Sequence, residues 1–290
     1  MVVVRLFVFI CCVVAAITSS GQPSSDIYLF DINSKKEHIV LQRGKNIANH
    51  KGYDNQPFFH PDKPLLYYAS ADSSGQTDIL VYNYSTGETS KVTDTPEHEY
   101  SPTVTPDKQF ISCIIQRLDG VQDLAKYPLN GGTPVVIVNN LTVGYHAWLN
   151  DNTVVLFVLG EPMTLRKVSV TTGKDTILAE NIGRSIHRIP KKSSISFVQK
   201  IAPGNWTINM IDEQAQHITT IATTLPNRED LAWTPDGRIL MSDDGKLYSF
   251  RPGDDKEWKE VEIQSPVAIK GITRIQVNNK GDKIAVVIAE

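Results

Sequence analysis

A Pro-Asp turn returns at a nearly constant interval along this chain, and that interval restricts the folds open to it. The turn occurs in "NQPFFHPDKPLLYYASA" (55–71), in "YSPTVTPDKQFISCIIQ" (100–116) and in "EDLAWTPDGRILMS" (229–242). With equivalent pairs included, turns begin at residues 61, 106, 150, 190, 235 and 279, spaced by 45, 44, 40, 45 and 44 residues. Units of this period predict a β-propeller with one blade per unit.

Each unit reads as four short strands separated by turn residues. In the first unit, "PLLYYASA" follows the Pro-Asp pair, and "TDILVYNY" and "TSKVTD" come after polar breaks rich in Ser and Gly. Alternating β-formers between such breaks are typical of strands. Pro presets the backbone of a tight turn and Asp can bond its own backbone two residues on. We therefore expect Asp62, Asp107 and Asp236 to stabilise turns rather than perform chemistry.

The two ends of the chain complete each other. The last unit, 271–290, contains two strands, and residues 26–44 read as a third and a fourth. Pairing them closes the ring and removes an open sheet edge. The prediction is an all-β fold, a six-bladed β-propeller of four-stranded antiparallel blades forming one domain over 26–290. The expected blades are 55–93, 101–138, 145–180, 184–222, 228–263, and 271–290 together with 26–44.

Residues 1–22 have the composition of a secretory signal peptide. Arg5 precedes an uncharged apolar run from Leu6 to Ile17, and small residues follow it. The run is short for a membrane span, which needs ~20 apolar residues. An uncleaved N-terminal anchor is the alternative. We expect an exported protein, in the periplasm or extracellular, with no integral membrane span after the leader is removed.

One cysteine, Cys113, lies outside the predicted leader, since Cys11 and Cys12 fall inside it. A single cysteine makes no intramolecular disulfide, so we expect the core to hold the fold together. The sequons at Asn83, Asn140 and Asn205 matter only in a eukaryotic secretory pathway.

The repeat resembles that of the TolB-type propellers. The segments "YSPTVTPDKQFISCIIQ" and "TDILVYNYSTGETSKVTD" carry the resemblance best, and it extends over 26–290, weakest in the third and fourth units. It implies a propeller fold, an exported location and WD-type repeats. The helical N-terminal domain of the Tol-system protein itself is not expected here, because no such segment precedes Asp26. The resemblance implies no particular ligand.

The loops entering each innermost strand should surround one mouth of the central channel. Aromatic and Arg residues in those loops are typical binding anchors. The candidate binding residues are Tyr100, Tyr145, His146, Arg184, Arg228 and Arg274.

The sequence favours a non-enzymatic scaffold that binds a protein segment or an extracytoplasmic glycan, as a monomer and without a cofactor. A net charge of -3 predicts no general attraction to nucleic acid. The motifs of α/β-hydrolases, zinc proteases, P-loops and dinucleotide sites are absent.

A metal-dependent enzyme is the alternative function. Some six-bladed propellers resemble lactone hydrolases, which hold a divalent cation in the channel with Glu, Asn and Asp. Oxygen ligands suit Ca²⁺ or Mg²⁺. The candidate ligands are Glu99, Asp230, Asn55 and Asp54.

Overall fold

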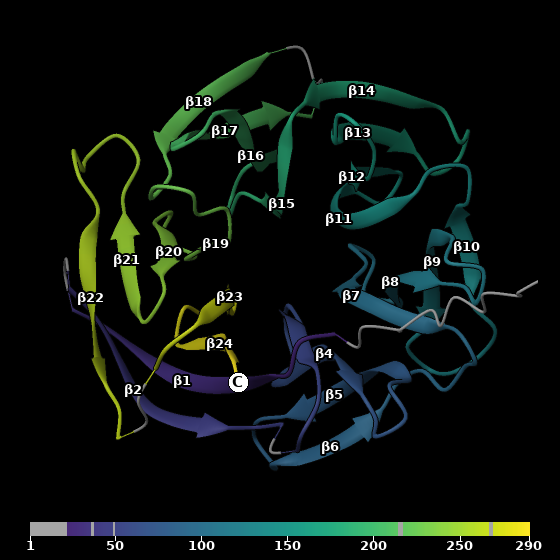
Figure 1. The fold of residues 1–290 in the computed structure, drawn as a ribbon, viewed down its shortest axis with the longest axis horizontal. Helices are drawn as coiled ribbons and strands as arrows, with labels where there is room; N and C mark the ends of the chain where they lie inside the picture. Colours follow the sequence, from purple (N-terminus) through teal and green to yellow (C-terminus); the bar gives the residue numbers. More distant parts are fainter. Residues whose placement is uncertain (1–21, 36–37, 49, 214–216, 267–268) are drawn as a thin grey trace, which may run out of the picture.

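The computed structural model describes residues 22–35, 38–48, 50–213, 217–266 and 269–290. The predicted leader falls outside these residues, apart from Gln22. Within them, β-strands follow one another along the whole chain around a central axis, as Figure 1 shows. None of the described residues form a helix long and apolar enough to cross a membrane. The prediction of an all-β, propeller-like fold with four-stranded antiparallel sheets is confirmed.

The strands fall into four classes by their distance from the axis (Figure 1). The innermost are β3 (Asp54–Phe59), β7 (His98–Val104), β11 (Val143–Asn150), β15 (Ile182–Arg188), β19 (Leu231–Trp233) and β23 (Ile272–Val277). The second are β4 (Leu65–Ala71), β8 (Phe110–Gln116), β12 (Thr153–Val158), β16 (Ser194–Ala202), β20 (Ile239–Asp243) and β24 (Lys283–Ala289). The third are β5 (Thr77–Asn83), β9 (Gln122–Pro128), β13 (Thr164–Ser169), β17 (Asn205–Asp212), β21 (Lys246–Phe250) and β1 (Ser25–Lys35). The outermost are β6 (Glu88–Lys91), β10 (Val135–Val138), β14 (Asp175–Glu180), β18 (Ile218–Thr223), β22 (Lys259–Gln264) and β2 (His38–Asn46).

The hydrogen bonding differs from the predicted six separate blades. Strands β3–β6, β7–β10, β11–β14 and β15–β18 form four four-stranded sheets, whereas the other strands form one eight-stranded sheet, β19-β20-β21-β22-β2-β1-β24-β23. The cause is a short parallel pairing between β2 and β22, from Val40 opposite Glu262 to Gln42 opposite Gln264. It joins two four-stranded antiparallel groups at their outer strands.

The two ends of the chain pair inside that sheet. Strand β1 runs antiparallel to β24, from Ser25 opposite Ala289 to Asp31 opposite Lys283. Phe30 on β1 is fully buried and packs in one cluster with Leu41 and Ile284. The sheet therefore has no free edge where the chain begins and ends.

The Pro-Asp turns differ in what their Asp side chains bind. The Asp107 carboxylate accepts hydrogen bonds from the Thr105 hydroxyl at 2.6 Å and from the Gln109 amide at 3.0 Å. Asp236 likewise accepts from the Thr234 hydroxyl at 2.5 Å and also from Arg251 at 2.6 Å.

Asp62 departs from this arrangement. His60 replaces the Thr, and its Nδ1 accepts from the backbone amides of Asp62 and Lys63. The exposed Asp62 carboxylate instead accepts from Lys108 of the next sheet at 2.5 Å. Asp62 therefore links two turns rather than closing its own.

Candidate functional site: the central channel

A cavity of about 460 Å³ runs along the axis and is lined by residues from, or directly beside, all six innermost strands. One repeat position supplies much of its mouth, five residues before the first residue of each turn pair. The residues at this position are Gln56, Ser101, Tyr145, Ser185, Asp230 and Arg274, and all of them line the cavity. We call these residues, together with the adjacent Arg184, the mouth ring.

Two arginines share one carboxylate in the mouth ring. Arg184 makes a bidentate contact with Asp230, through Nε at 3.1 Å and Nη2 at 2.6 Å. Arg274 donates to the same carboxylate from Nη1 at 3.3 Å, which is longer than the ~2.7–2.9 Å typical of charge-assisted bonds. The second acid nearby, Glu229, is engaged by the Arg184 backbone amide at 3.0 Å and by Lys200 at 3.1 Å. Arg274 is thus the less compensated of the two guanidinium groups.

Tyr145 connects the opposite side of the channel to this pair. Arg274 Nη2 donates to the Tyr145 hydroxyl at 2.6 Å, and the guanidinium carbon lies 4.9 Å from the centre of the Tyr145 ring. The Gln56 amide also donates to that hydroxyl, at 3.5 Å, while its carbonyl oxygen accepts from the Ser101 backbone amide at 2.7 Å. A continuous chain of hydrogen bonds therefore crosses the mouth between β7 and β15.

Backbone irregularities turn these side chains into the channel. Register shifts interrupt β3 between Asn55 and Phe58 and β7 between Tyr100 and Thr103. Within these bulges Gln56 has φ 56 and Ser101 has φ 53, a region that costs a non-glycine residue free energy. A bulge re-aims a side chain at the cost of one ladder pair, which is how two polar residues here reach the mouth.

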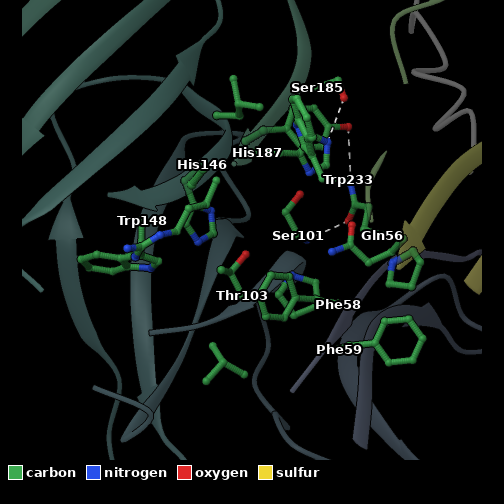
Figure 2. Close-up of a pocket in the computed structure, with 18 of the residues that line it drawn as sticks. Gln56, Phe58, Phe59, Ser101, Thr103, His146, Trp148, Ser185, His187 and Trp233 are labelled. Carbon is green, nitrogen blue, oxygen red and sulfur yellow. Dashed lines mark hydrogen bonds between the residues drawn. The ribbon is translucent and has the colours of Figure 1, made fainter. Parts of the chain in front are cut away.

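Deeper in the channel the lining becomes aromatic, with two histidines (Figure 2). His146 is buried and its Nε2 lies 2.7 Å from the Ser112 hydroxyl, which also accepts from the Trp148 indole at 2.8 Å. His187 Nε2 lies 2.9 Å from the Ser185 hydroxyl. Burial lowers the pKa of His146 to about 3 and that of His187 to about 4, so both rings are neutral near pH 7.

Half of the predicted binding residues lie in the mouth ring. Tyr145, Arg184 and Arg274 belong to it, and His146 lines the wall beneath. Tyr100 packs edge-on against Tyr53, with ring centres 6.3 Å apart, and does not line the cavity.

Arg228 lies outside the cavity. Its guanidinium is partly exposed and binds Asp243 at 2.6 Å. Its loop position suggested the mouth, but this ion pair holds it on the surface.

Three of the four predicted metal ligands are buried, and their side chains contact different partners. Glu99 is fully buried and accepts hydrogen bonds from Thr93 at 3.0 Å and from Tyr127 at 2.9 Å. The Asn55 amide donates to Ser25 at 3.2 Å, and the Asp54 carboxylate lies 3.1 Å from His50.

The fourth, Asp230, is held by the two mouth arginines. Among the described residues no three His, Cys, Asp or Glu side chains gather where they could hold a metal ion. The predicted set is thus not brought together, because β3 and β7 begin earlier than expected, at Asp54 and His98, and alternation turns Glu99 away from the channel.

Gln56, Ser101 and Ser185 contribute to the channel but were not among the predicted site residues. The repeat itself contained the signal. Counting five residues back from each turn pair gives the mouth position in every unit. Adding two gives a second cavity-lining position in five of the six units, as strand alternation predicts, and the exception is Ala232, which packs in the core.

Comparisons with known proteins support the fold. No family model and no curated protein matches this chain. A TolB-type protein of Agrobacterium tumefaciens has a similar structure, with a TM-score of 0.70 at 14% identity over 93% of this chain and 99% of that one. TolB of Acinetobacter baumannii matches with a TM-score of 0.58 at 11% identity, covering 91% of this chain and 63% of that one.

An enzyme is also among the similar structures. An oligogalacturonate lyase in complex with manganese has a TM-score of 0.55 at 14% identity, over 90% of this chain and 78% of that one. At these identities the likeness establishes the fold alone. This chain has the fold of the TolB-like β-propellers.

Proposed function

We infer that the chain is an exported, non-enzymatic binding module that holds a protein segment or an extracytoplasmic glycan at the mouth of its channel. The eight-stranded sheet contains two four-stranded antiparallel groups, so we count six blades around one channel. The predicted leader supports export to the periplasm or the extracellular space, and we propose a monomer.

The observation that carries the proposal is the mouth ring above a cavity of about 460 Å³. Ligand sites are typically concave, ~300–1,000 Å³, mostly apolar, and carry a few convergent polar groups. The channel has this composition, with Trp148, Trp233 and Phe58 on its walls and two arginines at its mouth. Our preference for a binding role over the metal-dependent alternative is supported by Glu99, Asn55 and Asp54, whose side chains contact Thr93, Ser25 and His50 rather than one another.

The test is capture of partners with matched arginine variants. The immobilised protein is exposed to an extract of the compartment into which it is exported, as wild type, Arg184→Ala and Arg228→Ala. Arg184 belongs to the mouth ring, whereas Arg228 is a surface arginine paired with Asp243. We expect partners that Arg184→Ala loses and Arg228→Ala keeps. Identical partner sets for all three proteins would contradict a channel site.

A further inference from the structure

The charged groups of the channel do not balance. Arg184, Arg274 and the exposed Arg188 line it against one lining carboxylate, Asp230, which gives the lining a formal charge of +2 when the two histidines are neutral. Glu229 lies behind the lining, 3.9 Å from Arg184 Nε, and its charge is shared with Lys200 at 3.1 Å. No carboxylate contact to Arg188 is found among the described residues. A concave site focuses the field of such a charge and raises its attraction for anions.

The excess charge is concentrated at Arg274. Its side chain is 15% exposed, and its contact to Asp230 is the long one, because that carboxylate is already bound bidentately by Arg184. Its contacts with the Tyr145 hydroxyl, the Tyr145 ring and Asp230 restrict the position of the guanidinium. A planar guanidinium of fixed orientation suits a carboxylate better than any neutral group.

We propose that the channel takes a ligand bearing a carboxylate on an apolar or ring-shaped body, with the carboxylate at Arg274 and the body against the aromatic walls. This rests on the proposed function and names its ligand chemistry. Phe58, Trp148 and Trp233 supply the walls. Asp230 and the Tyr145 hydroxyl compete with the ligand for Arg274. We call these two contacts the latch, and the ligand carboxylate replaces them.

Two pairs of probes test the charge requirement and separate two sources of a carboxylate. Glucuronate is compared with glucose, and an acetylated Ala-Phe dipeptide acid with its C-terminal amide, by calorimetric titration of the whole exported chain. We expect the acid of at least one pair to bind about tenfold or more tightly than its neutral partner, which is the value of one charge-assisted hydrogen bond. The tighter acid identifies the source. Equal affinities within both pairs would overturn the proposal.

Gain-of-binding variants make the test independent of folding defects. Asp230→Asn removes the competing carboxylate, and Tyr145→Phe removes the competing hydroxyl but keeps the ring under Arg274. Both should tighten binding of the acid probe, Asp230→Asn by about tenfold, and Arg274→Gln should abolish it. Arg228→Gln is the control and should bind as wild type does. If a folded Asp230→Asn protein binds the acid more weakly than wild type, Asp230 does not compete with the ligand and the proposal is wrong in this respect. If Asp230→Asn does not fold, the affinity of Tyr145→Phe for the acid provides the same test.

The same proteins separate this inference from the proposed function. A captured partner that depends on Arg184, yet is not displaced by either acid probe, would reject the carboxylate ligand and leave the channel site standing. The opposite result is that the acid probes bind at Arg274 but Arg184→Ala captures the same partners as wild type. That result would reject the binding-module proposal instead.

Discussion

Arg274 on β23 donates a 2.6 Å hydrogen bond to the hydroxyl of Tyr145 on β11, across 129 residues of sequence. The two strands belong to different sheets, so this bond spans the channel rather than following its wall. It lies in the chain of contacts from Ser101 to Arg184 that defines the mouth. The mouth ring is therefore a tertiary feature, made by side chains that the propeller brings together.

The coupling between these two residues is measurable. We expect Tyr145→Phe to lower the free energy of unfolding by about 0.5–1.5 kcal/mol, the net value of one hydrogen bond. A double-mutant cycle with Arg274→Gln should give a coupling energy of about 0.5 kcal/mol or more, because the pair is in direct contact. Denaturant unfolding measures both. Strictly additive effects would mean that the bond does not form in solution.

The repeat predicted most of the fold because the turn and the strands recur in the sequence itself. Pro61, Pro106 and Pro235 mark the ends of innermost strands, and the pairing of the chain ends appears as expected between β1 and β24. The pairing of β2 with β22 could not be predicted from the repeat. It depends on how two outer strands lie in space, and neither strand carries a local signal for it.

Candidate site residues were predicted less well because a loop and a strand start look alike in sequence. Tyr145, Arg184 and Arg274 were found because they are large and polar near the expected mouth. Glu99 and Asn55 look the same by those criteria, yet the strand pairing turns them away from the channel and toward a neighbouring sheet, where they contact Thr93 and Ser25. Gln56 was missed because only the register of the repeat, and not its residue type, marks it.

Asp107 should stabilise its turn more than Asp62 does. Asp107 accepts two hydrogen bonds within the turn, so Asp107→Ala should lose about 0.5–1.5 kcal/mol. Asp62 is exposed and, among the described residues, its carboxylate pairs with Lys108 alone, so Asp62→Ala should lose less. Thermal unfolding of the two variants measures the difference, and equal losses would contradict the assignment.

The Asp107 contribution should also depend on pH. Burial raises the pKa of Asp107, but the hydrogen bonds from Thr105 and Gln109 outweigh burial and leave the pKa below its usual value. A lowered pKa in the folded state contributes stability above the unfolded pKa of ~3.9, and that contribution is lost as the pH falls. The gap between wild type and Asp107→Ala should therefore close below about pH 4.

Glu99 should give the protein the opposite pH dependence. Burial is the main cause that raises the pKa of Glu99 to about 7, against hydrogen bonds from Thr95, Tyr127 and Thr93. The folded state then holds a proton that the unfolded state releases near pH 4.5, so stability falls as the pH rises from about 4.5 to 7. Glu99→Gln should flatten this slope in denaturant unfolding at pH 5 and pH 8. An unchanged slope would show that Glu99 is ionised in the fold.

The packing of β2 on β1, next to the pairing of the chain ends, is open to a steric test. A Cβ on Gly44 would clash with the ring of Phe30, which is fully buried beside β24. Gly44→Ala should therefore cost about 1–3 kcal/mol through overpacking. In a Phe30→Leu background, Gly44→Ala should cost less stability than it does in the wild type, because the smaller side chain leaves room for the Cβ. A Gly44→Ala protein as stable as wild type would mean that β2 packs on β1 more loosely than the structure indicates.

The emission of the channel tryptophans tests the binding role of the channel most directly. Trp148 and Trp233 line the cavity and Trp206 and Trp258 do not, so the Trp206→Phe, Trp258→Phe double variant reports the channel alone. We expect the captured partner, or the acid probe, to change this emission saturably, with the same affinity that calorimetry gives. If calorimetry shows that the partner binds while the tryptophan emission stays constant, the binding site lies elsewhere on the propeller.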